Sequence, residues 1–189
     1  MEAFSDAVIA IIITIMVLEF KVPRDATWNG LEELIPTFTC YVLSFGFLAV
    51  YWINHHQLVH CIKLVNSKVL WSNMLLLFFL TLIPFSTGWM AENEYARLPV
   101  LFYLANIFLC AIGGYVMLRS VTSQIYQDNR LFEVIKGNTR KNIISMGLYV
   151  IAFILAFVEP KLSLIPIAFA SILWIIPDKR IEKLLNTEN

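Results

Sequence analysis

Two polar residues, Ser5 and Asp6, stand at the start of the first apolar segment of this 189-residue chain. The oxygens of serine and aspartate can accept hydrogen bonds from the first free N–H groups of a helix. With Ser5 as the N-cap, Phe4 and Ile9 occupy the two positions of a hydrophobic staple. Capping explains Ser5 well. It explains Asp6 less well, because Asp6 immediately precedes an unbroken apolar run.

That run carries one narrow stripe with a polar atom. At about 100° per residue, four of its side chains fall within roughly a 60° sector of a helix: Ala7, Ile11, Thr14 and Leu18. The opposite face carries only apolar side chains: Ile9, Ile12, Ile13, Met16 and Phe20. The Thr14 hydroxyl can bond back to a main-chain carbonyl one turn earlier.

A second polar group, made of Trp52, Asn54, His55 and His56, lies near the end of the second apolar segment. Adjacent histidines on a helix point about 100° apart and do not chelate one ion well. His56 and His60 have the i, i+4 spacing of a helical metal site, but no nearby glutamate or cysteine is expected to complete it. The sequence therefore predicts no metal site and favours an interhelical polar cluster, since polar groups in a membrane need partners.

The third apolar segment contains Pro84, with Thr81, Ser86 and Thr87 around it. A proline inside a helix frees a main-chain carbonyl, and hydroxyl side chains can satisfy the freed group. The sequence predicts a kink at this position.

The composition indicates what kind of protein positions these residues. Hydrophobic residues make up 59% of the chain, charged residues 15%, and the mean hydropathy is +0.71. Soluble domains carry about 25% charged residues, so we expect an integral membrane protein. The 14 Lys and Arg balance the 14 Asp and Glu, which gives no reason to expect nucleic-acid binding. No hydrolase, kinase, P-loop or dinucleotide motif is present, so neither an enzyme nor a cofactor is expected.

Six apolar stretches approach the length of about 20 residues that a spanning helix needs. They cover residues 4–22, 35–58, 69–90, 98–118, 143–158 and 162–176. An all-α fold with six transmembrane helices, forming one domain over residues 1–189, is therefore predicted. The long connection 119–142 is expected to be a polar loop with some helix.

The loops between these stretches differ in basic charge. Four of the 14 basic residues, Lys21, Arg24, Arg97 and Lys161, fall in alternate loops, which leaves ten on the other side. The positive-inside rule places the ten in the cytoplasm. Both termini are then cytoplasmic, and the chain is a multi-pass protein of the cell membrane.

The residues quoted above resemble the signature of the transmembrane protein 175 family, the lysosomal and prokaryotic potassium channels. Phe4-Ser5-Asp6-Ala7 is similar to the first-helix motif of that family, and Trp52-Ile-Asn54-His55-His56 is similar to the motif of its second helix. Pro84-Phe85 resembles part of the third. The resemblance implies six helices in each subunit and a homotetramer in the lipid bilayer. It also implies a pore that the first helix lines without a glycine-rich carbonyl filter.

The same resemblance implies roles for individual residues. Ile11 matches an apolar constriction, Thr14 a threonine one turn further out, and Leu18 a second apolar ring. The polar signature Ser5-Asp6 matches groups that hydrogen-bond to Trp52 and His55. The expected function is a channel for potassium and other monovalent cations. An isoleucine ring can act as its gate by dewetting.

Two other functions stay open at the level of sequence. A proton-coupled secondary transporter could use Asp6 and the His55/His56 cluster as a relay, although the paired halves of such transporters are not evident. A metal-binding membrane protein could be built around His55, His56 and His60.

Overall fold

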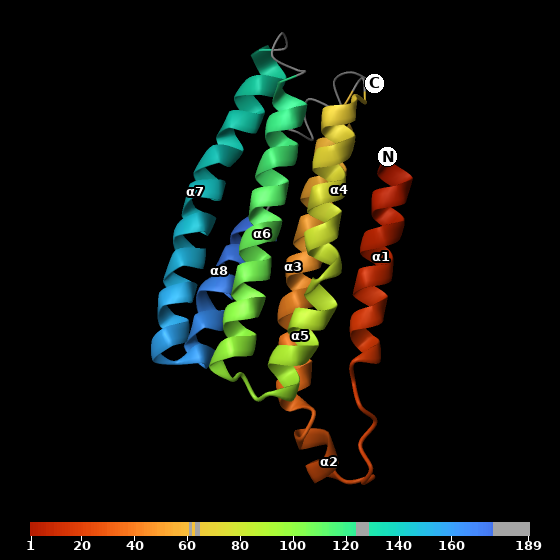
Figure 1. Ribbon diagram of the computed structural model, residues 1–189, viewed down its shortest axis with the longest axis vertical. Coiled ribbons are helices and arrows are strands. Elements are labelled where there is room, and N and C mark those ends of the chain that lie inside the picture. Colours follow the sequence, from red (N-terminus) through yellow and green to blue (C-terminus); the bar gives the residue numbers. More distant parts are fainter. Residues whose placement is uncertain (61, 63–64, 124–128, 176–189) are drawn as a thin grey trace.

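The computed structural model describes residues 1–60, 62, 65–123 and 129–175, with the side chains of 129–140 and 142 outside the description. These residues form helices joined by turns and loops, and no strand occurs among them. The helices run side by side along the long axis of the molecule, with α1 at one edge of the bundle and α7 at the other (Figure 1). The predicted all-α class is therefore confirmed.

The chain begins with α1 (Glu2–Leu18), followed by the short α2 (Trp28–Glu32) and the long α3 (Ile35–His60). Helix α1 ends four residues before Val22, the predicted end of the first segment. Contacts beyond the helix explain the early end. The Glu19 carboxylate lies against Gly88, where an added Cβ would come within 2.9 Å of Oε2. Lys21 Nζ then pairs with Glu92 Oε1 at 2.6 Å.

The third apolar segment is divided into α4 (Ser67–Thr81) and α5 (Ile83–Glu92), with the break at Leu82. Pro84 lies in the first turn of α5, where its missing N–H costs no helical hydrogen bond. The Thr81 hydroxyl donates to the Phe78 carbonyl at 2.7 Å, and that of Thr87 donates to the Ile83 carbonyl at 2.7 Å. The interruption predicted at this proline is present.

The second half of the chain forms α6 (Arg97–Thr122), α7 (Asn129–Val158), a 3-10 turn η1 (Pro160–Ser163) and α8 (Leu164–Ile175). The predicted fifth stretch, 143–158, is only the later part of α7, because the polar residues before it continue the same helix. Much of the expected 119–142 loop is thus helical. Ile176, the predicted end of the sixth stretch, lies outside the described residues.

The core lies between α4 and α6 and extends to α1, α3 and α5. Gly113 on α6 allows the two central helices to approach closely, because a Cβ there would meet the Leu76 Cα at 3.0 Å. On its inner side α1 packs against α3, α4 and α5, whereas α7 packs against α6 and α8. Helix α1 is therefore held from one side only within the subunit.

Within the described ranges, three helical stretches are long and apolar enough to cross a bilayer: Trp28–His60, Ser67–Glu92 and Arg97–Thr122. Two shorter apolar helices follow, Ile143–Val158 and Pro160–Ile175. These helices indicate a membrane protein.

Candidate functional site

Helix α1 has a buried face and an exposed face. Ser5, Ile9, Ile12 and Met16 are at most 3% exposed and point into the subunit. On the other side Ile11 is 56% and Leu18 80% exposed, and Thr14 is also exposed. The apolar face predicted from helical periodicity is thus the face that packs, and the stripe with the hydroxyl is left uncovered in the single subunit.

The Thr14 hydroxyl donates a hydrogen bond to the Ile11 carbonyl at 2.9 Å. This is the local bond to the main chain that the sequence allows as the alternative to a role in binding cations. The two uses are compatible, because a hydroxyl has one hydrogen to donate and two lone pairs. With its hydrogen directed to the main chain, the Thr14 oxygen can still accept hydrogen bonds or coordinate a ligand through its lone pairs.

Small residues lie on the exposed side of α1 near its start. Ala3, Ala7 and Ala10 are all exposed in the subunit. Small side chains at such spacings allow transmembrane helices to approach one another closely. This end of the exposed face is therefore narrow enough for contact with neighbouring helices.

The first link between α1 and α3 joins Asp6 and Trp52. The indole Nε1 of Trp52 donates to Asp6 Oδ1 at 2.8 Å. The carboxylate, which capping alone explained poorly, thus has its partner on another helix. The bond lies at the outside of the subunit, where Trp52 is 39% exposed.

The second link is buried and runs through Asn73 on α4. Ser5 Oγ lies 3.0 Å from Asn73 Nδ2, and His55 Nε2 lies 2.8 Å from Asn73 Oδ1. The expected contact between the signature and His55 is therefore indirect. Sequence reasoning missed Asn73, although an amide within an apolar segment is costly without partners and is itself a signal.

Asn54 faces away from α1. Its Nδ2 donates to the Val50 carbonyl at 2.7 Å and reaches the Trp174 carbonyl at 3.5 Å. It therefore connects α3 to α8. Phe4, the remaining residue of the predicted signature, is 53% exposed beside the stripe.

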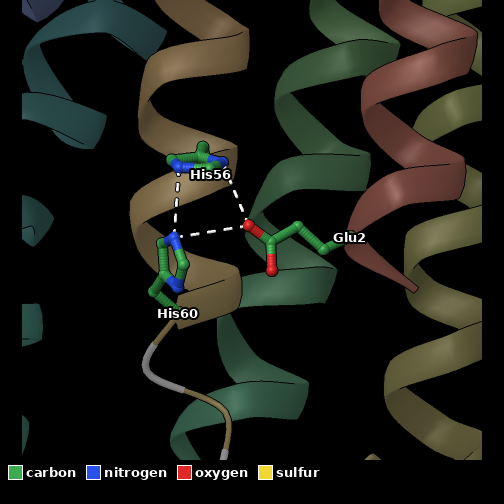
Figure 2. A group of neighbouring side chains, drawn as sticks. All are labelled: Glu2, His56 and His60. Carbon is green, nitrogen blue, oxygen red and sulfur yellow. Dashed lines mark hydrogen bonds and ion pairs between the residues drawn. The ribbon is translucent and has the colours of Figure 1, made fainter.

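At the same end of the bundle, Glu2 extends from α1 toward His56 and His60 on α3 (Figure 2). Glu2 Oε1 lies 3.4 Å from His56 Nδ1 and 3.3 Å from His60 Nε2. The two histidine rings meet with their Nε2 atoms 3.1 Å apart. The tertiary fold thus supplies a carboxylate that the sequence around the histidines does not show. His55 points elsewhere, as expected for adjacent positions on a helix.

At the opposite end, the loops with few basic residues come together. The Tyr95 hydroxyl donates to the Pro36 carbonyl at 3.0 Å, and burial raises the Tyr95 pKa to about 12. Lys161 Nζ lies over the Tyr95 ring, 5.6 Å from its centre. The hydrogen bond and charge of Glu92 raise the pKa of Lys21. Three of the loops assigned to one side of the membrane thus meet at one end of the bundle.

Comparison with known proteins gives consistent results. The profile of the family described as "Endosomal/lysosomal potassium channel TMEM175" matches residues 1–84. A potassium channel of Chryseobacterium sp. (strain P1-3) is 40% identical over 185 residues, which are 98% of this chain and 96% of that protein. A potassium channel of Chamaesiphon minutus (strain ATCC 27169 / PCC 6605) is 31% identical over 174 residues, 86% of this chain and 85% of that one.

The fold also resembles a solved structure. The crystal structure of a homologue of the lysosomal potassium-selective channel TMEM175 from Chamaesiphon minutus matches with a TM-score of 0.80 at 28% identity. The match covers 92% of this chain and 94% of that chain. The similarity therefore extends over almost the whole bundle.

Proposed function

The chain belongs to the TMEM175 family of potassium channels, and we propose that it conducts potassium through a homotetrameric pore lined by α1. Membership places it among channels and not among enzymes. The pore assignment rests on one observation. The only hydroxyl on the outward stripe of α1, that of Thr14, lies between the exposed apolar side chains of Ile11 and Leu18.

Four copies of this stripe around an axis would give three successive rings. At 1.5 Å of rise per residue, the Ile11 and Thr14 rings lie about 4.5 Å apart, and the Leu18 ring lies about 6 Å further on. The position of α1 at the edge of the subunit, with only one side packed, supports its placement on such an axis (Figure 1). The exposed alanines near the start of α1 support a close approach of four helices.

In the mechanism that we propose, the Ile11 ring forms the gate and the Thr14 ring provides the selectivity. A closed ring of Ile11 side chains excludes ions because water leaves the apolar constriction and a bare cation enters it only at high cost. The Thr14 hydroxyls replace part of the hydration shell of the passing ion. Weakly hydrated monovalent cations such as potassium lose water most easily, so they are favoured.

In the membrane we place six spans, α1, α3, α4 with α5, α6, the later part of α7, and α8. Helix α1 has 17 residues, the lower limit of the range of about 17–25 for a spanning helix. The excess of basic residues in alternate loops supports cytoplasmic termini in the cell membrane. The meeting of Lys21, Tyr95 and Lys161 at one end supports the same assignment of loops.

The contacts of the signature argue against the transporter alternative. Asp6 is hydrogen-bonded to Trp52, and His55 is hydrogen-bonded to Asn73. These bonds fix both groups in helix packing, whereas a proton relay needs them joined in one path. Membership of a channel family points the same way.

Planar-bilayer recording of the purified chain, with potassium on one side and sodium on the other, tests the function. Resolved single-channel openings with a reversal potential that favours potassium are expected. To test the lining, Leu18→Cys in a background without Cys61 should be blocked by a charged thiol reagent. Ile172→Cys on α8, also exposed in the subunit, should not. Equal block of both would place the pore elsewhere.

A further inference from the structure

We propose that Glu2, His56 and His60 form a binding site for a divalent transition-metal ion of the zinc class. The ion would join the first turn of α1 to the last turns of α3. The site itself does not depend on the proposed pore. Only its effect on conduction rests on the proposed function.

The three side chains already converge on one point (Figure 2). One ligand atom of each lies within 4.8 Å of the others. Tetrahedral zinc with bonds of about 2.0–2.1 Å separates its ligand atoms by about 3.3–3.4 Å. The closest approaches, 3.4 Å for Glu2–His56, 3.3 Å for Glu2–His60 and 3.1 Å between the histidines, are near this value.

His56 meets its two neighbours through different nitrogens. It faces Glu2 through Nδ1 and His60 through Nε2. A single ion therefore needs a rotation of the His56 ring or a small shift of the other two residues. All three side chains are between 35% and 49% exposed, so they have room for this movement.

The donor set selects the class of metal. Two imidazoles and one carboxylate suit zinc, cobalt, nickel or copper, whereas calcium and magnesium prefer sites made of oxygens. Histidines at i and i+4 of a helix present their rings on one face, as in helical zinc sites. Partial exposure leaves a fourth position for water.

A neighbouring ring covers one face of the His56 imidazole and limits the orientations that this ligand can adopt. The Trp52 ring stacks on His56 at 5.5 Å between centres with 29° between planes. The Trp52 indole is itself fixed by its hydrogen bond to Asp6. Outer contacts of this kind orient metal ligands. The Asp6–Trp52 bond thus supports both helix packing and the proposed site.

A bound ion would tether α1 to α3, because Glu2 belongs to one helix and the histidines to the other. If α1 lines the pore, the tether restricts the movement that opens it. Zinc on the side of the membrane that holds the N-terminus should then reduce potassium flux.

Calorimetric titration of the chelator-treated 189-residue chain with zinc chloride tests the site directly. One zinc ion per chain is expected, and Glu2→Gln, His56→Gln and His60→Gln should each weaken binding at least about tenfold. Glu32→Gln, an exposed glutamate on α2, is the matched control and should bind as wild type does. Cobalt(II) should show the visible absorption of a four-coordinate site in wild type and lose it in His60→Gln.

Zinc affinity that is unchanged in the double variant His56→Gln/His60→Gln would overturn the proposal, as would the absence of zinc binding to wild type. Potassium flux from liposomes in chelator separates this outcome from a failure of the proposed function. Flux without zinc binding would contradict the metal site and support the channel. Zinc binding without flux would contradict the channel and support the metal site. Equal inhibition by zinc of wild type and His60→Gln would show that zinc acts elsewhere.

Discussion

Trp52 Nε1 donates a hydrogen bond to Asp6 Oδ1 at 2.8 Å and thereby joins two helices at positions 46 residues apart. Removing either partner should weaken the attachment of α1. Asp6→Ala and Trp52→Phe should each lower the free energy of unfolding by about 1 kcal/mol, less than a buried charge-assisted bond contributes, because Trp52 is partly exposed.

The double variant tests whether the two residues act through each other. If the bond accounts for both losses, Asp6→Ala/Trp52→Phe should cost clearly less than the sum of the single changes. Thermal unfolding in detergent, with Asp25→Ala in an exposed loop as the control, measures the difference. Strict additivity would show that the bond contributes nothing to stability.

Thr14→Ala should lower the preference for potassium over sodium and leave the tetramer assembled. The change removes the hydroxyl lone pairs that we place on the ion path, while the bond lost to the Ile11 carbonyl is a local one. Reversal potentials under bi-ionic conditions give the ratio. Thr39→Ala is the matched control, since Thr39 makes the same kind of bond to the Ile35 carbonyl at 2.8 Å. An unchanged potassium/sodium permeability ratio in Thr14→Ala would show that the hydroxyl only bonds to the Ile11 carbonyl and does not contact the ion.

Ile11→Asn should raise potassium leak from liposomes, because a ring of smaller, polar side chains keeps its water. Ile11→Leu should stay near wild type, and Leu18→Asn should have a smaller effect if Leu18 forms only a second constriction. Ile172→Asn on α8 controls for a polar residue placed on an exposed helix face. An Ile11→Asn protein that assembles normally yet conducts no more than wild type would locate the limiting constriction elsewhere.

Gly113→Ala should destabilise the bundle by about 1–3 kcal/mol through overpacking. The added methyl would lie 3.0 Å from the Leu76 Cα, and this backbone atom cannot move without separating α4 from α6. Gly46→Ala meets nothing within 4 Å, so higher helix propensity should stabilise it by up to about 1 kcal/mol. Thermal unfolding of the two variants measures the difference. Equal changes in unfolding temperature would contradict the close packing of α4 against α6 at Gly113.

Tyr95 should make stability fall at high pH. Burial raises its pKa from 10.0 to about 12, so the folded protein holds this proton more tightly than the unfolded chain does. The resulting stability is complete below pH 10 and is lost as the pH rises toward 12. Tyr95→Phe should flatten this part of the melting profile and, at neutral pH, cost about 0.5–1.5 kcal/mol for the lost bond to Pro36. If the melting temperature of wild type and of Tyr95→Phe changed with pH in the same way, the loss of stability at high pH would not come from Tyr95.

The features that sequence predicted are those set by nearby residues. Helical periodicity separated the packed face of α1 from its exposed stripe, and Pro84 indicated the break between α4 and α5. The end of α1 at Leu18 was missed because it depends on Gly88 and Glu92, which are distant along the chain.

The candidate site shows the same division between local and tertiary information. The resemblance to the TMEM175 family implied that Ser5 and Asp6 would be partners of Trp52 and His55. The intermediate Asn73 is 68 positions from Ser5, and the carboxylate beside the histidines comes from Glu2 on another helix. Only the packing of α1 against α3 and α4 brings these groups together.

The polar side-chain contacts of α1 with other helices belong to its first turns, through Glu2, Ser5 and Asp6, and the next polar contact follows the helix, where Lys21 pairs with Glu92. A tilt of α1 about a pivot at its first turn would therefore have to break the Lys21–Glu92 pair at the far end. Leu18 lies about 20 Å along the helix from that pivot and Ile11 about 9 Å. A tilt of about 10° would displace Leu18 by about 3 Å and Ile11 by about half as much. The far opening of the stripe would thus widen most for a given tilt, and the Ile11 constriction would need a larger one.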